Sequence, residues 1–363
     1  MRKKLTTAAG TLLALASTVL ASAVLAAPST AQAGTPAQAG ARTEARATPG
    51  FHIADGRLLD ANGSDFVLRG VNHAHAWHPT RTTQALKDIK KLGANSVRVV
   101  LGTGDRWTKN DTADVAAVVT QCKQNRLICV LEAHDTTGYG EQEGAVPLSR
   151  AVDYWISVAD AVRGQEKYVI LNIGNEPYGN GASGATPWTA DTEKAIGRMR
   201  AAGFDHTLMV DAPNWGQDWS FTMRDHAAEV FDSDPAKNTM FSVHMYGVFN
   251  TADKVKNYLN RFTSQHLPIT VGEFGDMHSD GNPDEDAIMA TAQKLGVGYL
   301  GWSWSGNGGG VEYLDMATGF NAAQLTAWGR RIFSGPDGIQ RTAEEAGVFG
   351  SGLRKVGGQL PHQ

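Results

Sequence analysis

The chain has 363 residues and a mass of 38.7 kDa, with 42% hydrophobic and 19% charged residues. This composition supplies enough apolar material for a large folded domain and excludes intrinsic disorder. The formal charge of −4 argues against a nucleic-acid partner, because phosphates require clustered lysine and arginine. Two cysteines are too few for a multi-disulfide scaffold or a four-thiolate zinc site.

Residues 1–33 are typical of a secretory signal peptide. A positively charged start precedes an apolar run at 12–27 and a small-residue site at 31–33. The apolar run is short for a membrane anchor, which needs about 20 apolar residues. Residues 34–49, rich in alanine, glycine, threonine and proline, are expected to be a flexible leader. We therefore expect a secreted, extracellular protein that has no membrane partner.

The pattern beyond residue 50 predicts a barrel of alternating strands and helices. The turn sequences Asp55-Gly56 and Asn62-Gly63 indicate a small β-hairpin before the first barrel strand. Apolar runs then recur at spacings of 28 to 41 residues, each followed by a polar loop and an amphipathic helical stretch; they centre on Leu68, Arg98, Val130, Leu171, Met209, Val243, Val271 and Gly301. Examples of the helical stretches are 82–92, 112–125, 150–162, 189–202, 252–266 and 284–295.

Continuous apolar runs are typical of parallel strands that are covered on both faces. The sequence therefore predicts the α/β class: a single (β/α)8 TIM barrel over residues 50–335 with a small N-terminal β-hairpin cap. The alternative, an open doubly wound sheet, is expected to carry a glycine-rich nucleotide loop after its first strand, and no such motif is found. Residues 336–363 are rich in glycine and are expected to be a surface-hugging or mobile tail.

The two cysteines, Cys122 and Cys129, lie seven positions apart on a predicted helix and the strand that follows it. In an exported protein such a pair favours a disulfide, with two buried thiols as the alternative.

Polar residues follow nearly every predicted strand, where a TIM barrel has its active site. They are Asn72, His73, His75, Arg98, Glu132, His134, Asp135, Asn175, Glu176, Asp211, Asn214, His244, Tyr246 and Glu273, with Trp302 and Trp304 after the last strand. Glu176 and Glu273 each directly follow an apolar run, on strands 4 and 7, which face each other across a barrel mouth. Glycoside hydrolysis needs such a pair, with one carboxyl group protonated and the other ionised.

These strand ends resemble those of glycoside hydrolase family 5 of clan A. The resemblance lies in Asn175-Glu176-Pro177, Gly272-Glu273-Phe274-Gly275, Arg98, His134 and His244-x-Tyr246, in the family's strand order. Longer stretches, RGVNHAHAWH, EAHDTTGYGE, DAPNWGQDWS, HMYGVF and GWSWSGNGGGVEYLD, are similar to secreted bacterial endo-β-1,4-mannanases of that family. The resemblance covers about residues 66–333, nearly the whole predicted barrel.

The resemblance implies a retaining endo-β-1,4-mannanase that acts on mannan, galactomannan and glucomannan. It implies that Glu176 is the general acid/base and Glu273 the nucleophile, and that no cofactor is required. The substrate-binding residues expected on this basis are Arg98, His134, Asn175, His244, Tyr246, Trp302, Trp304 and Trp215. Trp302 is expected to lie under the sugar, although strand alternation would place Trp304 on the same face. Trp77, Trp107, Trp188 and Trp219 fall in or near predicted loops and are further candidates for stacking on sugars.

Three other hypotheses remain at this point. An endo-β-1,4-glucanase of the same family would share the carboxylate pair. A zinc amidohydrolase would use His73, His75 and His244, but lacks the further ligands expected after strands 4, 5 and 8. A non-catalytic carbohydrate-binding barrel would not need two facing carboxylates, which repel each other.

Two smaller predictions concern an acidic cluster and the oligomeric state. Asp284, Glu285 and Asp286 follow Pro283 and favour a helix start, with a stabilising surface calcium site as the alternative. No segment indicates an obligate partner, and we expect a monomer whose only partner is its polysaccharide substrate.

Overall fold

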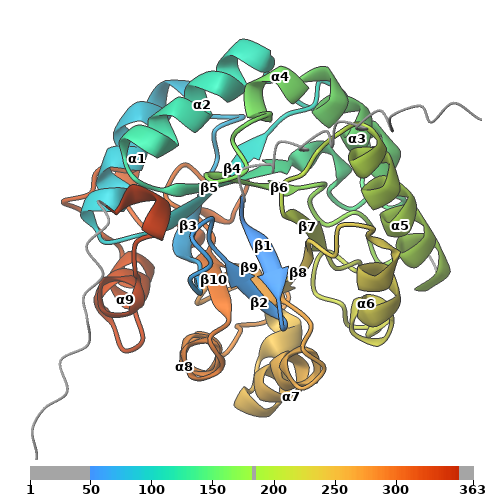
Figure 1. The fold of residues 1–363 in the computed structure, drawn as a ribbon. Helices are drawn as coiled ribbons and strands as arrows, with labels where there is room; N and C mark the ends of the chain where they lie inside the picture. Colours follow the sequence, from blue (N-terminus) through green and yellow to red (C-terminus); the bar gives the residue numbers. More distant parts are fainter. Residues whose placement is uncertain (1–49, 182–184, 351–363) are drawn as a thin grey trace, which may run out of the picture. The chain divides into compact units, whose positions relative to one another are not determined.

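The structure, a computed structural model, describes residues 50–181 and 185–350. Within these ranges, eight parallel strands close into a barrel in the order β10-β3-β4-β5-β6-β7-β8-β9 (Figure 1). The strands are β3 Arg69–His73, β4 Ser96–Leu101, β5 Ile128–Ala133, β6 Val169–Asn172, β7 Leu208–Asp211, β8 Thr239–Met245, β9 Ile269–Phe274 and β10 Gly298–Gly301. The predicted (β/α)8 TIM barrel is therefore confirmed.

Helices surround the barrel strands, as Figure 1 shows. They are α1 Thr82–Lys91, α2 Thr112–Gln124, α3 Leu148–Ser157, α4 Ala159–Val162, α5 Ala185–Ala201, α6 Thr222–Ser233, α7 Ala252–Thr263, α8 Glu285–Leu295, α9 Ala327–Ser334 and α10 Ile339–Thr342. Asp111, Thr251 and Asp284 begin α2, α7 and α8, where each side chain accepts a hydrogen bond from a backbone N–H of the first turn. The stretch expected as one helix at 150–162 is divided into α3 and α4 at Val158.

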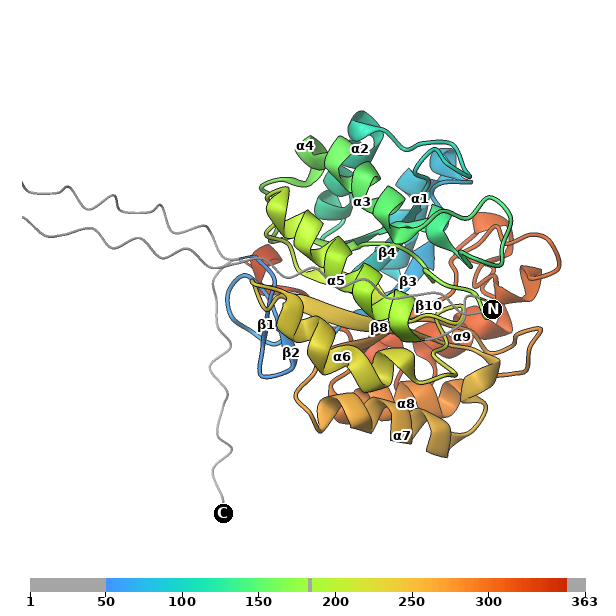
Figure 2. The ribbon, with the colours of Figure 1, turned by 90° about the vertical axis from the view of Figure 1, so that its right-hand side faces the viewer.

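The N-terminal hairpin covers the end of the barrel at which the strands begin. Its strands, β1 His52–Ala54 and β2 Arg57–Leu59, pair in antiparallel register around the turn at Asp55 and Gly56. Figure 2 shows this hairpin at one end of the barrel. The predicted hairpin cap is thus confirmed.

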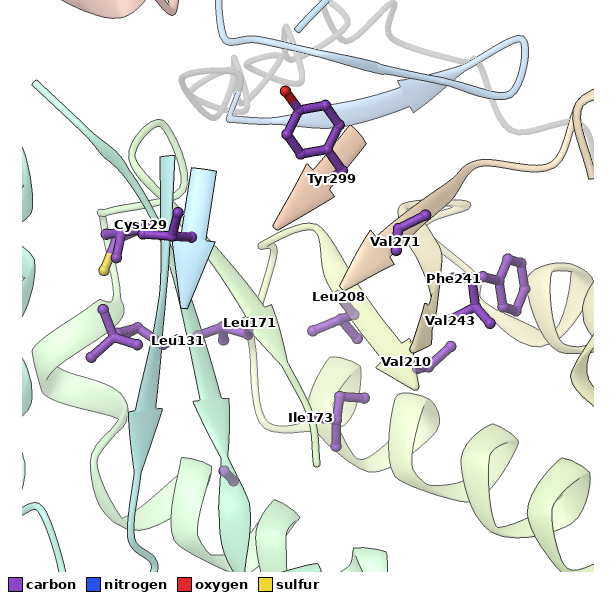
Figure 3. Packing of buried hydrophobic residues seen from close by; sticks show 14 of the residues in the cluster. Cys129, Leu131, Leu171, Ile173, Leu208, Val210, Phe241, Val243, Val271 and Tyr299 are labelled. Atoms are coloured by element: carbon purple, nitrogen blue, oxygen red, sulfur yellow. The ribbon is translucent and has the colours of Figure 1, made fainter. Parts of the chain in front are cut away.

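Strand alternation divides the apolar core into two clusters. Outward residues such as Cys129 and Leu131 of β5 pack with the surrounding helices, and Figure 3 shows part of this cluster. Inward residues of the same strand, Ile128 and Val130, pack with Phe51 and other residues at the hairpin end. Farther along the strands the inward positions become polar, at Arg98 on β4, Asn172 on β6 and Asp211 on β7. The polar end is therefore the one at which the strands finish.

The segment after residue 335 differs from the expected tail. Ile339 in α10 is fully buried in the outer core cluster, and Ala346 packs in the inner one. The buried Arg69 guanidinium, stacked on the Tyr299 ring, donates a 3.1 Å hydrogen bond to Thr342 Oγ1. The folded domain therefore extends to residue 350, and only residues 351–363 of the expected tail lie outside the described residues.

The predicted disulfide is not formed in this structure. Cys122 and Cys129 are buried free thiols whose sulfur atoms lie 3.0 Å apart, against about 2.05 Å for a bond. Both side chains belong to the apolar layer between α2 and β5, and burial raises the pKa of the Cys129 thiol. The alternative of two buried thiols is the one that the structure supports.

The expected signal peptide and leader, residues 1–49, lie outside the described residues. Among the helices in the part of the chain that the structure describes, none is both long enough and apolar enough to cross a membrane.

A buried ion pair outside the active site gives the first testable prediction. Asp234, fully buried before β8, accepts hydrogen bonds from Arg200 Nε and Nη2, each 2.9 Å long. Burial alone would raise the Asp234 pKa, but Arg200 lowers it to about 2, from 3.8. We expect Asp234→Asn to reduce the free energy of unfolding at pH 7 by about 2–3 kcal/mol, measured by urea denaturation.

The sign of the pH dependence follows from the lowered pKa of Asp234. Its stabilising contribution is present above the unfolded value of 3.8 and is lost as the pH falls towards 2. The difference between wild type and Asp234→Asn should therefore shrink between pH 4 and pH 2. If the two proteins differed in free energy of unfolding by the same amount at pH 3 and pH 7, the stabilising role of the Asp234 charge would be contradicted.

Candidate active site

Arg98 lies at the centre of the polar barrel mouth and contacts five side chains there. It lies on β4, is fully buried, and donates 2.7 Å hydrogen bonds to Glu273 Oε1 and Asn175 Oδ1. The remaining guanidinium hydrogens reach Asn172 Oδ1, Asn72 Oδ1 and Asp211 Oδ2, at 2.8, 2.9 and 3.1 Å. Burial alone would lower the Arg98 pKa, but neighbouring carboxylates, including Asp211 and Glu273, raise it. A permanently charged guanidinium is thereby held in one orientation.

Glu273 is held by two donors at the end of β9. Arg98 binds its Oε1, and the Tyr246 hydroxyl donates a 3.0 Å hydrogen bond to Oε2. Burial raises the pKa of Glu273, whereas the charges of His244 and Arg98 act in the opposite direction. Burial and the nearby Glu273 raise the pKa of Tyr246, so the phenol remains a hydrogen-bond donor. Both oxygens of the carboxylate are thus oriented by groups that favour its ionised form.

Glu176 follows β6 in a backbone conformation that ordinary residues rarely adopt, with φ at 38°. Its carbonyl accepts a 2.9 Å hydrogen bond from Gly138 N, and its N–H donates one of 3.3 Å to Asp211 Oδ2. These two contacts hold the strained backbone on either side of the residue. The Glu176 side chain points towards that of Glu273. An oxygen of the Glu176 carboxylate lies within 4.8 Å of an oxygen of the Glu273 carboxylate.

His244 on β8 lies between the two carboxylates. Its Nδ1 is 2.7 Å from Glu176 Oε1 and 3.5 Å from Glu273 Oε2, and its Nε2 is 3.3 Å from Asp211 Oδ2. Burial alone would lower the His244 pKa, but Glu273 and Asp211 raise it to about 10. The imidazole is therefore positively charged at neutral pH, so that both ring nitrogens carry a hydrogen.

Aromatic rings form one wall of the mouth. His134, whose Nδ1 lies 2.8 Å from Glu132 Oε1, is surrounded by three tryptophans at ring-centroid distances of 5.0 to 6.0 Å. They are Trp77, Trp107 and Trp302, of which Trp302 is nearly parallel to the imidazole, at 18°. Flat rings that are partly exposed beside a carboxylate pair suit stacking on pyranose rings.

A cleft of about 400 Å³ extends from Glu176 and Tyr246. Its lining residues follow β6, β7, β8 and β9, whereas the aromatic wall follows β3, β4, β5 and β10, so the two lie on opposite sides of the barrel mouth. Trp215 lies in the wall of the cleft, and its indole Nε1 donates a 3.1 Å hydrogen bond to Glu141 Oε2. The other lining residues are Asn180, Asn214, Gln217, Trp219, Val248, His278 and Asp280. The carboxylate pair therefore has tryptophans on both sides, as a chain-like substrate crossing the mouth would require.

The structure brings most of the predicted residues together but changes the roles of four of them. Arg98 and His244 have no exposed surface, so they orient the carboxylates rather than bind substrate. Trp304 is also fully buried, against Phe333. Strand alternation failed for Trp304 because β10 ends at Gly301, before either tryptophan. Trp188, expected in or near a loop as a candidate for stacking on sugars, is a buried residue of α5.

The residues of the zinc hypothesis and of the calcium hypothesis have other contacts in this structure. His73 and His75 bond Thr82 Oγ1 at 2.8 and 2.6 Å, which keeps both side chains away from His244. Asp284 caps α8, and Asp286 pairs with Arg331. Among residues 50–181 and 185–350, the one group of three metal-type ligands that converges is Glu176, His244 and Glu273.

Several functional residues were not selected from the sequence. Asp211 and Glu132 were noted as strand-end groups, but nothing local indicated their contacts with His244 and His134. Asn172 carried a usable signal, because alternation along β6 places it inward, two residues after Ile170. For His278 the sequence carried no such signal. This residue lies on a separate loop, and its ring stacks on the Tyr246 ring with 4.4 Å between the centroids.

Comparisons with known proteins show which family model, relatives and solved structures the chain matches. The family model described as Cellulase (glycosyl hydrolase family 5) matches residues 59–308. The chain is 60% identical over 322 residues to a mannan endo-1,4-beta-mannosidase of Streptomyces lividans, covering 88% of this chain and 83% of that protein. It is similar to the solved beta-mannanase from Thermomonospora fusca, with a TM-score of 0.82 and 60% identity over 83% of this chain and 100% of that one. A mannohexaose complex of that enzyme matches with a TM-score of 0.81 and 58% identity over the same shares.

Proposed function

The chain belongs to glycosyl hydrolase family 5, and from this we propose that it is a retaining endo-β-1,4-mannanase. It cleaves internal bonds of mannan, galactomannan and glucomannan by double displacement. The observation that carries the mechanism is the carboxylate pair, whose nearest oxygens lie within 4.8 Å. Retaining enzymes separate their carboxyl groups by about 5–5.5 Å, whereas inverting enzymes need about 6.5–9.5 Å to admit a water. The similarity to mannan-degrading relatives supports the choice of substrate.

In the first step, Glu273 attacks the anomeric carbon of the bound mannosyl unit. Arg98 and Tyr246 aim its two oxygens and keep the anion available. Glu176 donates a proton to the glycosidic oxygen as the C–O bond breaks, which releases one part of the polymer with a free hydroxyl. The products of this step are a mannosyl ester of Glu273 and an ionised Glu176.

In the second step, water hydrolyses this ester. Glu176 now accepts a proton from the water, whose oxygen attacks the anomeric carbon and displaces the Glu273 carboxylate. Glu176 ends protonated and Glu273 ionised, as at the start, and two inversions give net retention. Arg98 and Thr137 hold the Asn175 amide next to Glu176, which supports a contact between Asn175 and the sugar 2-hydroxyl.

The decisive experiment compares the release of reducing ends from galactomannan and from carboxymethylcellulose. We expect rapid cleavage of galactomannan and at most slow cleavage of the cellulose derivative. Preferential cleavage of cellulose would keep the mechanism and replace mannan by glucan. Activity on neither polymer, with binding retained, would favour the carbohydrate-binding alternative.

We further propose that catalysis needs no metal or organic cofactor. Glu176 and Glu273 supply the acid, base and nucleophile, while His244 and Arg98 supply the positive charge next to them. Dialysis against a chelator should therefore leave kcat/KM on galactomannan unchanged, in an assay against the untreated enzyme. Added calcium should also leave the melting temperature unchanged, because Asp284, Glu285 and Asp286 do not converge on one ion.

Two expectations about the cellular form of the protein are proposals as well. The charged and apolar pattern of residues 1–33 supports export and an extracellular location. Every group used in the two steps comes from one chain, which supports a monomeric enzyme. Mass analysis of the secreted protein and its sedimentation in solution would test the two proposals.

A further inference from the structure

Asp211 lies next to the catalytic pair and contacts Arg98, His244 and the backbone of Glu176. Its Oδ2 lies 3.1 Å from Arg98 Nη2, 3.3 Å from the backbone N of Glu176, and 3.3 Å from His244 Nε2. The contact with His244 is an ion pair rather than a well-aligned hydrogen bond. Asp211 is buried, and protein groups bind both of its carboxylate oxygens, so it acts through these neighbours and not by contact with substrate.

The position of Asp211 is itself well anchored. Its Oδ1 accepts a 3.0 Å hydrogen bond from Asn172 Nδ2, and its backbone carbonyl accepts one of 2.9 Å from Trp188 Nε1. Burial alone would raise the Asp211 pKa, but His244 and Arg98 lower it to about 2. A carboxylate of fixed charge and fixed position therefore lies directly behind His244.

We propose that Asp211 is a positioning residue that keeps His244 positively charged throughout the reaction cycle. The inference rests on the proposed function of Glu176 and Glu273. His244 faces Glu176 from β6, Asp211 from β7 and Glu273 from β9, and Arg98 from β4 lies behind the same carboxylates.

The reaction cycle makes Asp211 different from the other two carboxylates. Glu273 loses its negative charge when it becomes a sugar ester, and Glu176 gains or loses a proton in each step. Asp211 takes part in neither bond change, so its charge is constant. It is therefore the one carboxylate around His244 that can hold the imidazolium equally in the free enzyme and in the glycosyl-enzyme.

The charge of His244 has a definite use. Donation from Nδ1 to Glu176 Oε1 orients that carboxyl group and leaves Oε2 to carry the proton that is transferred. The same Nδ1 lies 3.5 Å from Glu273 Oε2, so the cation also offsets repulsion between the two carboxylates. Neutral His244 would lose this electrostatic effect even if its ring stayed in place.

The effect of removing Asp211 has a clear sign. Loss of its negative charge lowers the His244 pKa from about 10, so the imidazole becomes neutral at a lower pH. In Asp211→Asn the titration of His244 should therefore move towards acid.

The test compares Asp211→Asn with Asp234→Asn, which removes another buried, arginine-paired aspartate far from the carboxylates. We expect kcat of Asp211→Asn on galactomannan to fall about tenfold or more at neutral pH, with KM changed little. Asp234→Asn should be less stable, with kcat and the His244 titration unchanged.

NMR of labelled histidine provides a second readout. The His244 ring in the wild-type enzyme should remain protonated up to about pH 9, since its pKa is about 10. Titration of wild-type His244 near 6.5 would overturn the proposal, even if Asp211→Asn did not fold. A folded Asp211→Asn variant with the wild-type kcat and the wild-type His244 titration would do so too. Failure of this proposal can be distinguished from failure of the proposed function. If the proposed function were wrong, the Glu273→Gln variant would remain active.

Discussion

Glu273→Gln is expected to lower kcat on galactomannan by about 10⁴-fold or more. The amide has nearly the shape of the carboxylate but cannot form the glycosyl ester, so the first step has no nucleophile. Arg98 and Tyr246 would still contact the side chain, because the amide keeps one acceptor oxygen. The measurement is the initial rate of reducing-end release at saturating substrate.

Three controls make the Glu273 result specific. Circular dichroism should show a folded variant, and titration calorimetry should show that it still binds mannohexaose. Glu229→Gln, the same substitution at an exposed position on α6, should retain wild-type activity. The wild-type enzyme should also release its first product with retained configuration, followed by NMR. Release of the inverted anomer would exclude the double displacement.

Glu176→Ala is expected to reduce kcat/KM on galactomannan by about 10²–10⁴-fold, since the leaving oxygen then departs without a proton. The size of the loss should depend on the leaving group. A mannobioside with an activated aryl leaving group needs no proton, so its first, glycosylation step should keep a rate close to that of wild type. The measurement is the pre-steady-state burst of the aryl product, compared with turnover of the polymer.

The second step should remain slow in Glu176→Ala, because no base activates the water. The glycosyl-enzyme should therefore accumulate, and a small anionic nucleophile such as azide should restore turnover of the aryl substrate without needing a base. Equal losses on the polymer and on the aryl substrate, with no effect of azide, would show that Glu176 has another role.

Strand periodicity explains why so much of the barrel was predictable. Each apolar run is local in sequence, and the residues that end each run must lie at one rim of a parallel barrel. Glu176 after β6 and Glu273 after β9 were therefore placed at the same rim before any distance was known. The family resemblance added their roles, which periodicity does not contain.

The predictions from the sequence failed where the outcome did not depend on local sequence patterns. Trp304 lies beyond the end of β10, where strand alternation no longer determines which way a side chain points. The thiols of Cys122 and Cys129 lie close together, but nearness does not by itself make a bond. The domain boundary at 335 missed α10, because four helical residues with one buried isoleucine carry little periodic signal.

The sequence by itself determined the order of strands and helices, the rim on which the chemistry lies, and the identity of the two carboxylates, because these depend on short-range periodicity and on residue types. The tertiary structure alone decided which side chains meet. Closure of the barrel brings Asp211, His244 and Arg98 from β7, β8 and β4 into contact with Glu176 and Glu273. Charges and protonation states depend on such contacts and on burial, and both arise only when strands distant in sequence are packed around one axis.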